Sequence, residues 1–331
     1  MADPDDALVR TADIEVREVT TGPDLALAGA MLDTQELVLG LPLVDEAERV
    51  RLAAAVSRAP DELRSAEPRW RPIVACRDEE MVGYAGIMLP DDPEGLAVGD
   101  LAPARLPGAW AGIVPALLNG LEALIGTDAA GLQVWVRHVD IGDLAPAVSA
   151  GYRVDRRLGV LGRTLEEVAA PRPPSGTVVR TYREDIDDEA VVEVLAAAYE
   201  GTGDGGWDLA RFRSRRQLPW FRADDLFLAV DDDGAVGGLH WLKRRDAMTG
   251  EVYNLAVHPD AQGRGLGPVL LGAGLEHLRA VGCAEVILWV DRANERAVSL
   301  YTRWGFETRW DDVALHHELP HAAGPPEPGP S

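Results

Sequence analysis

The sequence predicts an α/β protein that contains two tandem copies of one fold. Three observations lead to this prediction. The chain has 331 residues, which suggests about two domains. Its second half aligns with its first at a constant offset of 154 residues. The second half also contains a strand, a glycine-rich loop and a helix in direct succession. The fold class therefore follows from length, repetition and local pattern.

The internal repeat runs without a gap from about Ala75 to Leu161 in the first copy. Identical pairs are Ala75/Ala229, Val82/Val236, Gly83/Gly237, Leu101/Leu255, Leu121/Leu275, Glu122/Glu276, Trp135/Trp289 and Gly151/Gly305. We expect a first domain over residues 1–168, a proline-rich linker over 169–176, a second domain over 177–320 and a disordered tail over 321–331.

Composition excludes several classes of protein. The formal net charge of −23 argues against a nucleic-acid partner, because phosphate contacts need clustered cations. The acidic start Met1–Leu8 and the lack of a long apolar run predict a cytoplasmic protein without a membrane partner. Cys76 and Cys283 have no metal-binding spacing, so we expect buried thiols and no metal. We also expect a monomer.

The glycine-rich loop 262–267 is the most informative segment. It follows a predicted strand that includes Val252–Val257, and its alternating glycines let backbone N–H groups point into one concavity. Pro268 suits the first position of the helix that follows, whose apolar residues recur at helical spacing as far as Leu278. The segment lacks the later acidic residue of a dinucleotide site and the Lys-Ser/Thr ending of a nucleotide P-loop. The sequence therefore predicts a site for a diphosphate.

Further elements follow this loop. Leu288–Val290 is predicted as the next strand, residues 294–301 as a helix with Asn294 and Tyr301 two turns apart, and Gly305-Phe306 as a turn. The loop together with this Asn-x-x-Ala-x-x-x-Tyr helix resembles the GCN5-related N-acetyltransferase (GNAT) superfamily.

That resemblance implies that each domain is a mixed, mostly antiparallel sheet flanked by helices, and that acetyl-CoA is the cosubstrate. It implies coenzyme contacts from Leu255, Ala256, Val257, Gln262, Gly263, Arg264, Gly265, Leu266, Gly267, Pro268, Asn294 and Ala297. Asn294 would by default cap its helix, and we expect both roles.

The resemblance also implies three catalytic residues. Glu251 would take a proton from the amine, directly or through water; otherwise it is an exposed carboxylate at a strand end. Leu255 would by default be a core residue, but in the family its backbone N–H, freed where the strand splays at a bulge, points at the thioester carbonyl. Tyr301 would protonate the leaving thiolate or else be an aromatic core residue.

Segments outside these motifs resemble the mycothiol synthases, a family of tandem acetyltransferases. They are Gly205–Trp207, Pro219–Phe221, Leu226–Ala229, Leu239–Lys243 and Glu251–Tyr253. This resemblance implies acetyl transfer to the cysteinyl amine of desacetylmycothiol, a small molecule. It implies substrate contacts from Glu251, Lys243, Asp45, Asp204 and Trp289.

The chain departs from that family at two positions. Gly203 stands where a glutamate is usual, with Asp204 or Glu200 as possible replacements, and Trp289 stands where a tyrosine is expected. Lys243 and Asp45 are equally compatible with solvated surface charges. Recognition of the inositol part of desacetylmycothiol depends on whether a carboxylate replaces the missing glutamate.

The first copy has lost the features of this site. In the repeat register Gly108 stands opposite Gln262, Trp110 opposite Arg264 and Ile113 opposite Gly267. Ala97 stands opposite Glu251, and Ala147 opposite Tyr301. We therefore expect a degenerate, non-catalytic first domain that buttresses the second and walls its substrate cleft.

Two other functions remain open. The first is an acetyltransferase for another small primary amine, such as an antibiotic or a polyamine. The second is a non-catalytic protein that binds acyl-CoA, which would need the loop but neither Glu251 nor Tyr301.

Overall fold

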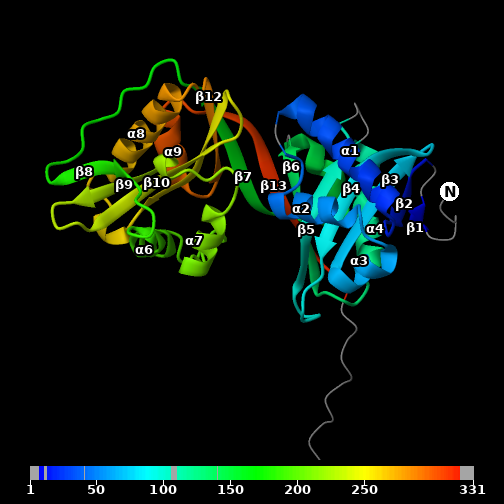
Figure 1. Cartoon of the computed structure of the whole chain (residues 1–331). Helices are drawn as coiled ribbons and strands as arrows, with labels where there is room; N and C mark the ends of the chain where they lie inside the picture. The colour runs from blue at the N-terminus through cyan, green and yellow to red at the C-terminus, as the bar shows by residue number, and fades with distance from the viewer. Residues whose placement is uncertain (1–6, 11–12, 41, 106–109, 140, 321–331) are drawn as a thin grey trace, which may run out of the picture. The chain divides into compact units, whose positions relative to one another are not determined.

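The computed structural model describes residues 7–10, 13–40, 42–105, 110–139 and 141–320 (Figure 1). The predicted tail 321–331 and Gly108 lie outside the described residues. The chain forms two compact units. Unit 1 contains the described residues up to Leu158 together with those from Trp310 onward, and unit 2 runs from Gly159 to Arg309.

These units do not coincide with the boundaries expected from the repeat. The division falls inside two strands, β7 (Arg153–Thr164) and β13 (Glu307–Glu318). Most of β13 therefore belongs to unit 1, where it pairs antiparallel with β6 (Gly131–Val139) from Asp311 onward. Similarity in sequence shows to which copy of the repeat a segment belongs. Contacts show in which unit that segment packs, and for β13 the two differ.

Unit 1 is a sheet with helices on both faces. Its strand order is β1-β2-β3-β4-β5-β6-β13, with β5 parallel to β6 and the other neighbours antiparallel. Its remaining elements are β1 (Ala7–Arg10), β2 (Glu15–Glu18), α1 (Gly22–Leu39), α2 (Glu46–Ala55), α3 (Pro60–Ala66), β3 (Trp70–Arg77), β4 (Glu80–Met88), β5 (Leu96–Pro103), α4 (Trp110–Ile125) and α5 (Ala145–Ser149).

Alternation along the strands of unit 1 produces two cores. Ile73 and Ala85 point to the face covered by α4, whereas their neighbours Val74 and Tyr84 point to the face covered by α1, α2 and α3. Because both faces are covered, the central strands are apolar at almost every position, as in the buried run of β4.

Unit 2 repeats this plan. Its strand order is β7-β12-β11-β10-β9-β8, with β11 parallel to β12. Its remaining elements are β8 (Thr177–Thr181), α6 (Asp188–Ala198), α7 (Leu209–Arg216), β9 (Leu226–Asp231), β10 (Val236–Arg244), β11 (Thr249–Val257), α8 (Leu266–Ala280), β12 (Glu285–Asp291) and α9 (Glu295–Arg303). The predicted fold class, mostly antiparallel sheets flanked by helices, is confirmed.

The two faces of the unit 2 sheet carry different cores. One core joins Val286 and Leu288 of β12 to Leu275 of α8 and Tyr301 of α9. The other gathers Trp241 of β10 with aromatic side chains from α7 and the segments that flank it. The segment 169–176 is irregular, and the Ala170 N–H donates to Glu276 Oε1 of α8 at 2.9 Å, so it is anchored to the helix.

Two further expectations concern the whole chain. Within the described ranges, no helix is long and apolar enough to span a bilayer. Cys76 and Cys283 are both free thiols, Cys283 buried and Cys76 half-buried. The prediction of buried thiols is therefore confirmed for Cys283 and only partly for Cys76.

Candidate functional site

The loop between β11 and α8 forms an open backbone cradle. Gly263 and Gly265 adopt φ values of 78° and 80°, in the left-handed region that a side chain disfavours. A Cβ atom added at either position would meet no atom within 4 Å, so the space in front of the loop is empty. The cradle leads into the N-terminus of the 15-residue helix α8, where unpaired N–H groups and the helix dipole favour an anion.

The helix begins earlier than the sequence suggested. Its first residue is Leu266, so Pro268 occupies the third helical position, and the prediction of proline at the first position was wrong by two residues. The first turn includes Gly267, which keeps the approach to the cradle free of side chains. Because proline has no N–H, the donors in this turn are those of its neighbours.

Side chains around the loop supply local positive charge in an acidic chain. Arg264 is exposed and makes no hydrogen bond or ion pair with the described residues. Arg296 of α9 donates to Gln262 Oε1 at 2.6 Å, which ties α9 to the loop. The backbone cradle and these two arginines together fit a diphosphate, and thus the coenzyme that the sequence motif implies.

The strand before the loop, β11, parts from its neighbour β12 partway along its length. The parallel pairing of β11 with β12 covers four positions and ends at Val252↔Leu288, although β11 continues to Val257. A register irregularity on the other side of β11 leaves Tyr253 between the pairs Leu242↔Val252 and Trp241↔Asn254. Leu255 lies beyond both features, opposite His240.

In unit 1 the equivalent opening is closed. The parallel pairing of β5 with β6 covers six positions and runs on to Leu101↔Val136, and Leu101 is the repeat counterpart of Leu255. At the counterparts of Arg264 and Gly267, Trp110 and Ile113 are buried. The first copy therefore has neither the strand opening nor the empty cradle over the positions described.

Glu251 lies on β11 just before the strands part. It is 7% exposed, and its Oε2 accepts a hydrogen bond from Arg245 Nη1 at 2.9 Å. No other hydrogen bond links its carboxylate to the described residues. One oxygen of a largely buried carboxylate is thus held by a cation while the other remains available.

Tyr301 of α9 is buried beside the same strands. Its ring packs edge-on against Phe306 at 5.5 Å, so it is a core residue as the default interpretation expected. Its hydroxyl makes no hydrogen bond with the described residues. Burial, and secondarily the electrostatic effect of the nearby Tyr199, raises the pKa of Tyr301 above its ordinary value. The phenol is therefore protonated at neutral pH.

Asn294 and Ala297 meet at the start of α9. The Asn294 side chain accepts a hydrogen bond from the Ala297 N–H at 3.1 Å, so the capping role is confirmed. Asn294 is exposed. Its pantetheine contact stays a prediction, as do the contacts of Leu255, Ala256 and Val257.

Residues expected to contact the acceptor share one face of the unit 2 sheet. Lys243 lies directly opposite Glu251 across the β10–β11 pair. Trp289 lies on β12 on the same face, with the Arg245 guanidinium 5.5 Å from its ring centre. The Lys243 ammonium lies 4.9 Å from the ring centre of Trp220, at the edge of an aromatic cluster centred on Trp241.

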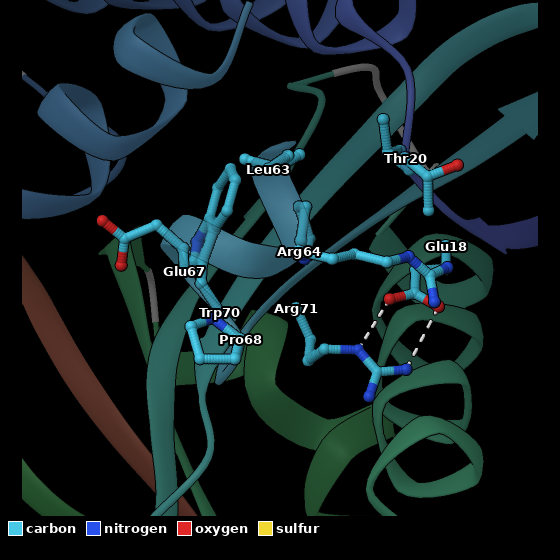
Figure 2. A pocket seen from close by; sticks show the side chains of 10 residues that line it. Glu18, Thr20, Leu63, Arg64, Glu67, Pro68, Trp70 and Arg71 are labelled. Atoms are coloured by element: carbon cyan, nitrogen blue, oxygen red, sulfur yellow. Dashed lines mark hydrogen bonds and ion pairs between the residues drawn. The ribbon is translucent and has the colours of Figure 1, made fainter. Parts of the chain in front are cut away.

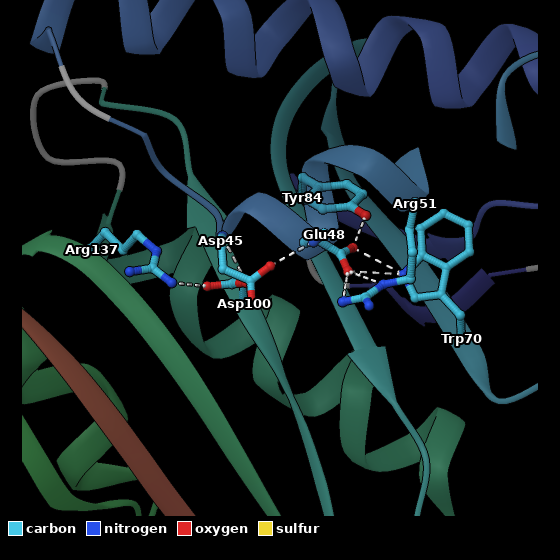
Figure 3. A network of polar contacts seen from close by, with 7 residues as sticks. All are labelled: Asp45, Glu48, Arg51, Trp70, Tyr84, Asp100 and Arg137. Carbon is cyan, nitrogen blue, oxygen red and sulfur yellow. Dashed lines mark hydrogen bonds and ion pairs between the residues drawn. The ribbon is translucent and has the colours of Figure 1, made fainter. Parts of the chain in front are cut away.

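Asp204 and Asp45 lie outside these strands. Asp204 is exposed in the loop after α6, and its charge adds to the burial that raises the pKa of the nearby Tyr199. Asp45 belongs to unit 1 and caps α2 by accepting a hydrogen bond from the Glu48 N–H at 2.5 Å (Figure 3). The buried Glu48 carboxylate in turn accepts hydrogen bonds from Tyr84 and Trp70. Asp45 therefore has a structural role of its own, and its substrate contact stays a prediction.

Unit 1 also contains a pocket that the sequence did not indicate. It has a volume of about 240 Å³ and lies between β2, α3 and β3 (Figure 2). Arg71 Nε donates to Glu18 Oε1 at its edge at 2.6 Å, so that pair is already neutralised.

Sequence reasoning missed Arg245 and Tyr199. The signal for Arg245 was present, because Trp241, Lys243 and Arg245 alternate along β10 and its extension and so point to one face. No local signal marked Tyr199, which approaches Tyr301 only through tertiary packing. Over the described residues, no cluster of three or more His, Cys, Asp and Glu side chains could hold a metal ion.

Comparisons with known proteins agree with this geometry. The model of the acetyltransferase (GNAT) family matches residues 189–306. A mycothiol acetyltransferase from Actinosynnema mirum is 36% identical over 271 residues, covering 81% of this chain and 91% of that protein. One from Saccharopolyspora erythraea is 37% identical over 243 residues, covering 70% and 80% respectively.

Solved structures show the same fold. A GCN5-related N-acetyltransferase from Sphaerobacter thermophilus superposes with a TM-score of 0.67 at 21% identity, covering 95% of this chain and 98% of that one. A tandem GNAT protein from the clavulanic acid biosynthesis pathway gives 0.64 at 20% identity, covering 92% and 98%. With the sequence relatives and the domain match, these findings show that the chain belongs to the mycothiol acetyltransferase family and is an acetyl-CoA-dependent N-acetyltransferase with tandem GNAT domains.

Proposed function

We propose that the protein transfers the acetyl group of acetyl-CoA to the cysteinyl amine of desacetylmycothiol, by direct attack with Glu251 as base and Tyr301 as acid. The observation that carries this proposal has three parts: a nearly buried carboxylate on β11, an empty glycine cradle directly after that strand, and, in the core beside β11 and β12, a buried phenol without a hydrogen bond to the described residues. The mycothiol acetyltransferases among its relatives supply the substrate class.

The coenzyme is held mainly by backbone. The N–H groups of loop 262–267 and the start of α8 bind the diphosphate, with Arg264 adding positive potential. The residues Leu255, Ala256 and Val257 line the pantetheine arm along the free edge of β11, and Asn294 and Ala297 flank it. When bound, acetyl-CoA supplies the acetyl group as a thioester.

Glu251 prepares the amine. Its free oxygen removes a proton from the incoming ammonium, directly or through water, while Arg245 keeps the other oxygen fixed. A cysteinyl α-amine titrates near ~7.7–8.0, so a useful fraction is already neutral at pH 7 and a carboxylate is a sufficient base. The Leu255 N–H stabilises the negative charge that develops on the carbonyl oxygen.

Tyr301 completes the transfer. Its phenol, kept protonated by burial, lies on α9 beside the strand opening and donates its proton to the departing sulfur. A departing thiolate with a pKa of ~8.5 is a weaker base than a tyrosinate, so the step needs assistance from the surroundings. The raised pKa of Tyr301 thus keeps the phenol protonated, but it also makes proton transfer to the thiolate less favourable.

The acceptor lies on the sheet face that carries Lys243 and Trp289. Lys243 and the neighbouring aromatic side chains suit a polyhydroxylated molecule, because aromatic rings pack on sugar C–H groups and an ammonium binds hydroxyls. Asp204 replaces the glutamate expected at Gly203. The first domain itself is non-catalytic, since its strand opening is closed.

A second function, acetylation of another small amine, is favoured by one observation. Trp289 lies under Arg245 where the related enzymes are expected to have a tyrosine hydroxyl. Steady-state rates with desacetylmycothiol, cysteine, glucosamine and spermidine distinguish the two. A strong preference for desacetylmycothiol supports the first proposal, and preference for another amine replaces it by the second.

A further inference from the structure

We propose that Arg245 is a positioning residue for acetyl transfer: it fixes the Glu251 carboxylate so that one oxygen faces the amine. This inference rests on the proposed role of Glu251 as base. Arg245 itself is not expected to touch the reacting atoms.

Arg245 is well placed for this role. It follows β10 directly, and its backbone N–H donates to the Thr249 carbonyl at 3.0 Å, which closes the turn between β10 and β11. Asp246 Oδ1 accepts hydrogen bonds from the N–H groups of Met248 and Thr249 at 2.7 and 2.8 Å, which stiffens the same turn. The guanidinium therefore starts from a rigid backbone only six residues from Glu251.

The Arg245 side chain is held at its far end as well. Its Nη1 donates to Glu251 Oε2 at 2.9 Å, and its guanidinium carbon lies 5.5 Å from the ring centre of Trp289. The two ionic side chains are only 21% and 9% exposed, so solvent screens the pair weakly. A planar cation between an aromatic ring and a carboxylate has little freedom to rotate.

The other neighbours of Glu251 do not hold its carboxylate. Lys243 lies opposite it on β10, but its ammonium lies over Trp220. Ile287, its register partner on β12, is apolar. Arg245 is thus the side chain among the described residues that forms an ion pair with Glu251.

The test combines three variants with wild-type enzyme, assayed for kcat and for KM of acetyl-CoA and of the amine. Arg245→Gln is expected to lower kcat about 10- to 100-fold with little change in KM for acetyl-CoA, because a misplaced base costs rate rather than coenzyme affinity. Arg245→Lys, which restores the charge but not the planar guanidinium, is expected to recover part of kcat. Arg279→Gln, an exposed arginine at the end of α8, is the matched control and is expected to behave as wild type.

The double variant Arg245→Gln with Glu251→Gln separates the two proposals. If Arg245 acts through Glu251, the double variant is no slower than Glu251→Gln alone. Losses that multiply would overturn the positioning role, and so would a wild-type kcat in Arg245→Gln beside a slow Glu251→Gln. A wild-type rate in Glu251→Gln would instead reject Glu251 as base. Melting temperatures of all variants show whether a loss of rate reflects unfolding.

Discussion

At Glu251, the proposed general base, two requirements of that role meet in one side chain. The carboxylate must be shielded from water, and it is only 7% exposed, yet one oxygen must stay open to the amine, and Arg245 holds the other oxygen. The sequence located Glu251 from its place at the start of a strand before the loop. It did not reveal the partner, because an ion pair between a strand and a turn depends on the geometry of the hairpin.

Replacing Glu251 with glutamine tests its role through pH. At about pH 6.5 the α-amine, with a pKa of ~7.7–8.0, is mostly protonated and needs a base, whereas at about pH 9 it is mostly neutral. We therefore expect Glu251→Gln to lower kcat/KM about 100-fold at the lower pH and clearly less at the higher. Glu193→Gln, an exposed position on α6, serves as control. The same fractional loss at both pH values would exclude Glu251 as base.

Replacing Tyr301 with phenylalanine keeps the ring that packs against Phe306 and removes only the hydroxyl. Since that hydroxyl has no hydrogen bond within the described residues, the melting temperature should hardly change. Loss of a general acid should nevertheless lower kcat about 100-fold or more. Stopped-flow and steady-state assays of the variant and the wild type measure this loss of kcat. An unchanged kcat with normal stability would assign Tyr301 to the core alone.

At the level of elements, the loop and helix α8 were largely predictable. Alternating glycines and the apolar spacing that follows them specify a turn and a helix from local information alone. The start of α8 was misplaced by two residues, because the preference of proline for the first helical turn does not fix its position within that turn. The parting of β11 from β12 was expected only by family resemblance, since strand pairing is non-local.

Gly265 offers a direct test of the cradle. Its φ of 80° disfavours any β-branched residue, and a side chain there would project into the space before α8. We expect Gly265→Val to abolish acetyl-CoA binding in calorimetry. Gly234, with φ of 86° and equally free space, lies in the hairpin between β9 and β10, so Gly234→Val carries the same backbone strain away from the loop. Retained affinity in Gly265→Val would place the coenzyme elsewhere.

His240 connects β10 to α8 by a hydrogen bond and lies opposite Leu255 of the neighbouring strand β11. Its Nδ1 donates to the Leu270 carbonyl at 2.8 Å, and complete burial lowers the pKa of His240 to about 4. The unfolded chain therefore binds a proton at higher pH than the folded chain, and stability falls as the pH drops from about 6.5 through 4. We expect the stability difference between wild type and His240→Gln to shrink over this range in urea unfolding. A constant difference would show that His240 does not titrate there.

At the scale of the whole molecule, the sequence anticipated two copies of one fold but not how the chain divides between them. The self-similarity was strong enough to reveal the repeat and the lost loop of the first copy. It could not show that β13 pairs with β6 in unit 1, because the partner of a terminal strand depends on competing long-range contacts. The sheet face proposed for the acceptor was equally hidden from the sequence, since it combines residues of β10, β11, β12 and the segment around Trp220.

The net charge of −23 belongs to this scale too. A strongly acidic surface repels an anionic coenzyme at long range, so binding must rely on short-range backbone donors and on Arg264. The same acidity is compatible with a cationic amine as acceptor. Charge alone therefore does not choose between desacetylmycothiol and a polyamine, and the acceptor must be identified by turnover.

The most direct measurement is steady-state release of coenzyme A thiol from acetyl-CoA, corrected for the thiol of the acceptor, with desacetylmycothiol compared with cysteine, glucosamine and spermidine. The proposed function predicts a kcat/KM for desacetylmycothiol about 100-fold or more above that of each other amine, because only it fills both the amine position and the face around Lys243 and Trp289. An equal or higher kcat/KM with spermidine, or no turnover of desacetylmycothiol, would contradict the proposed substrate.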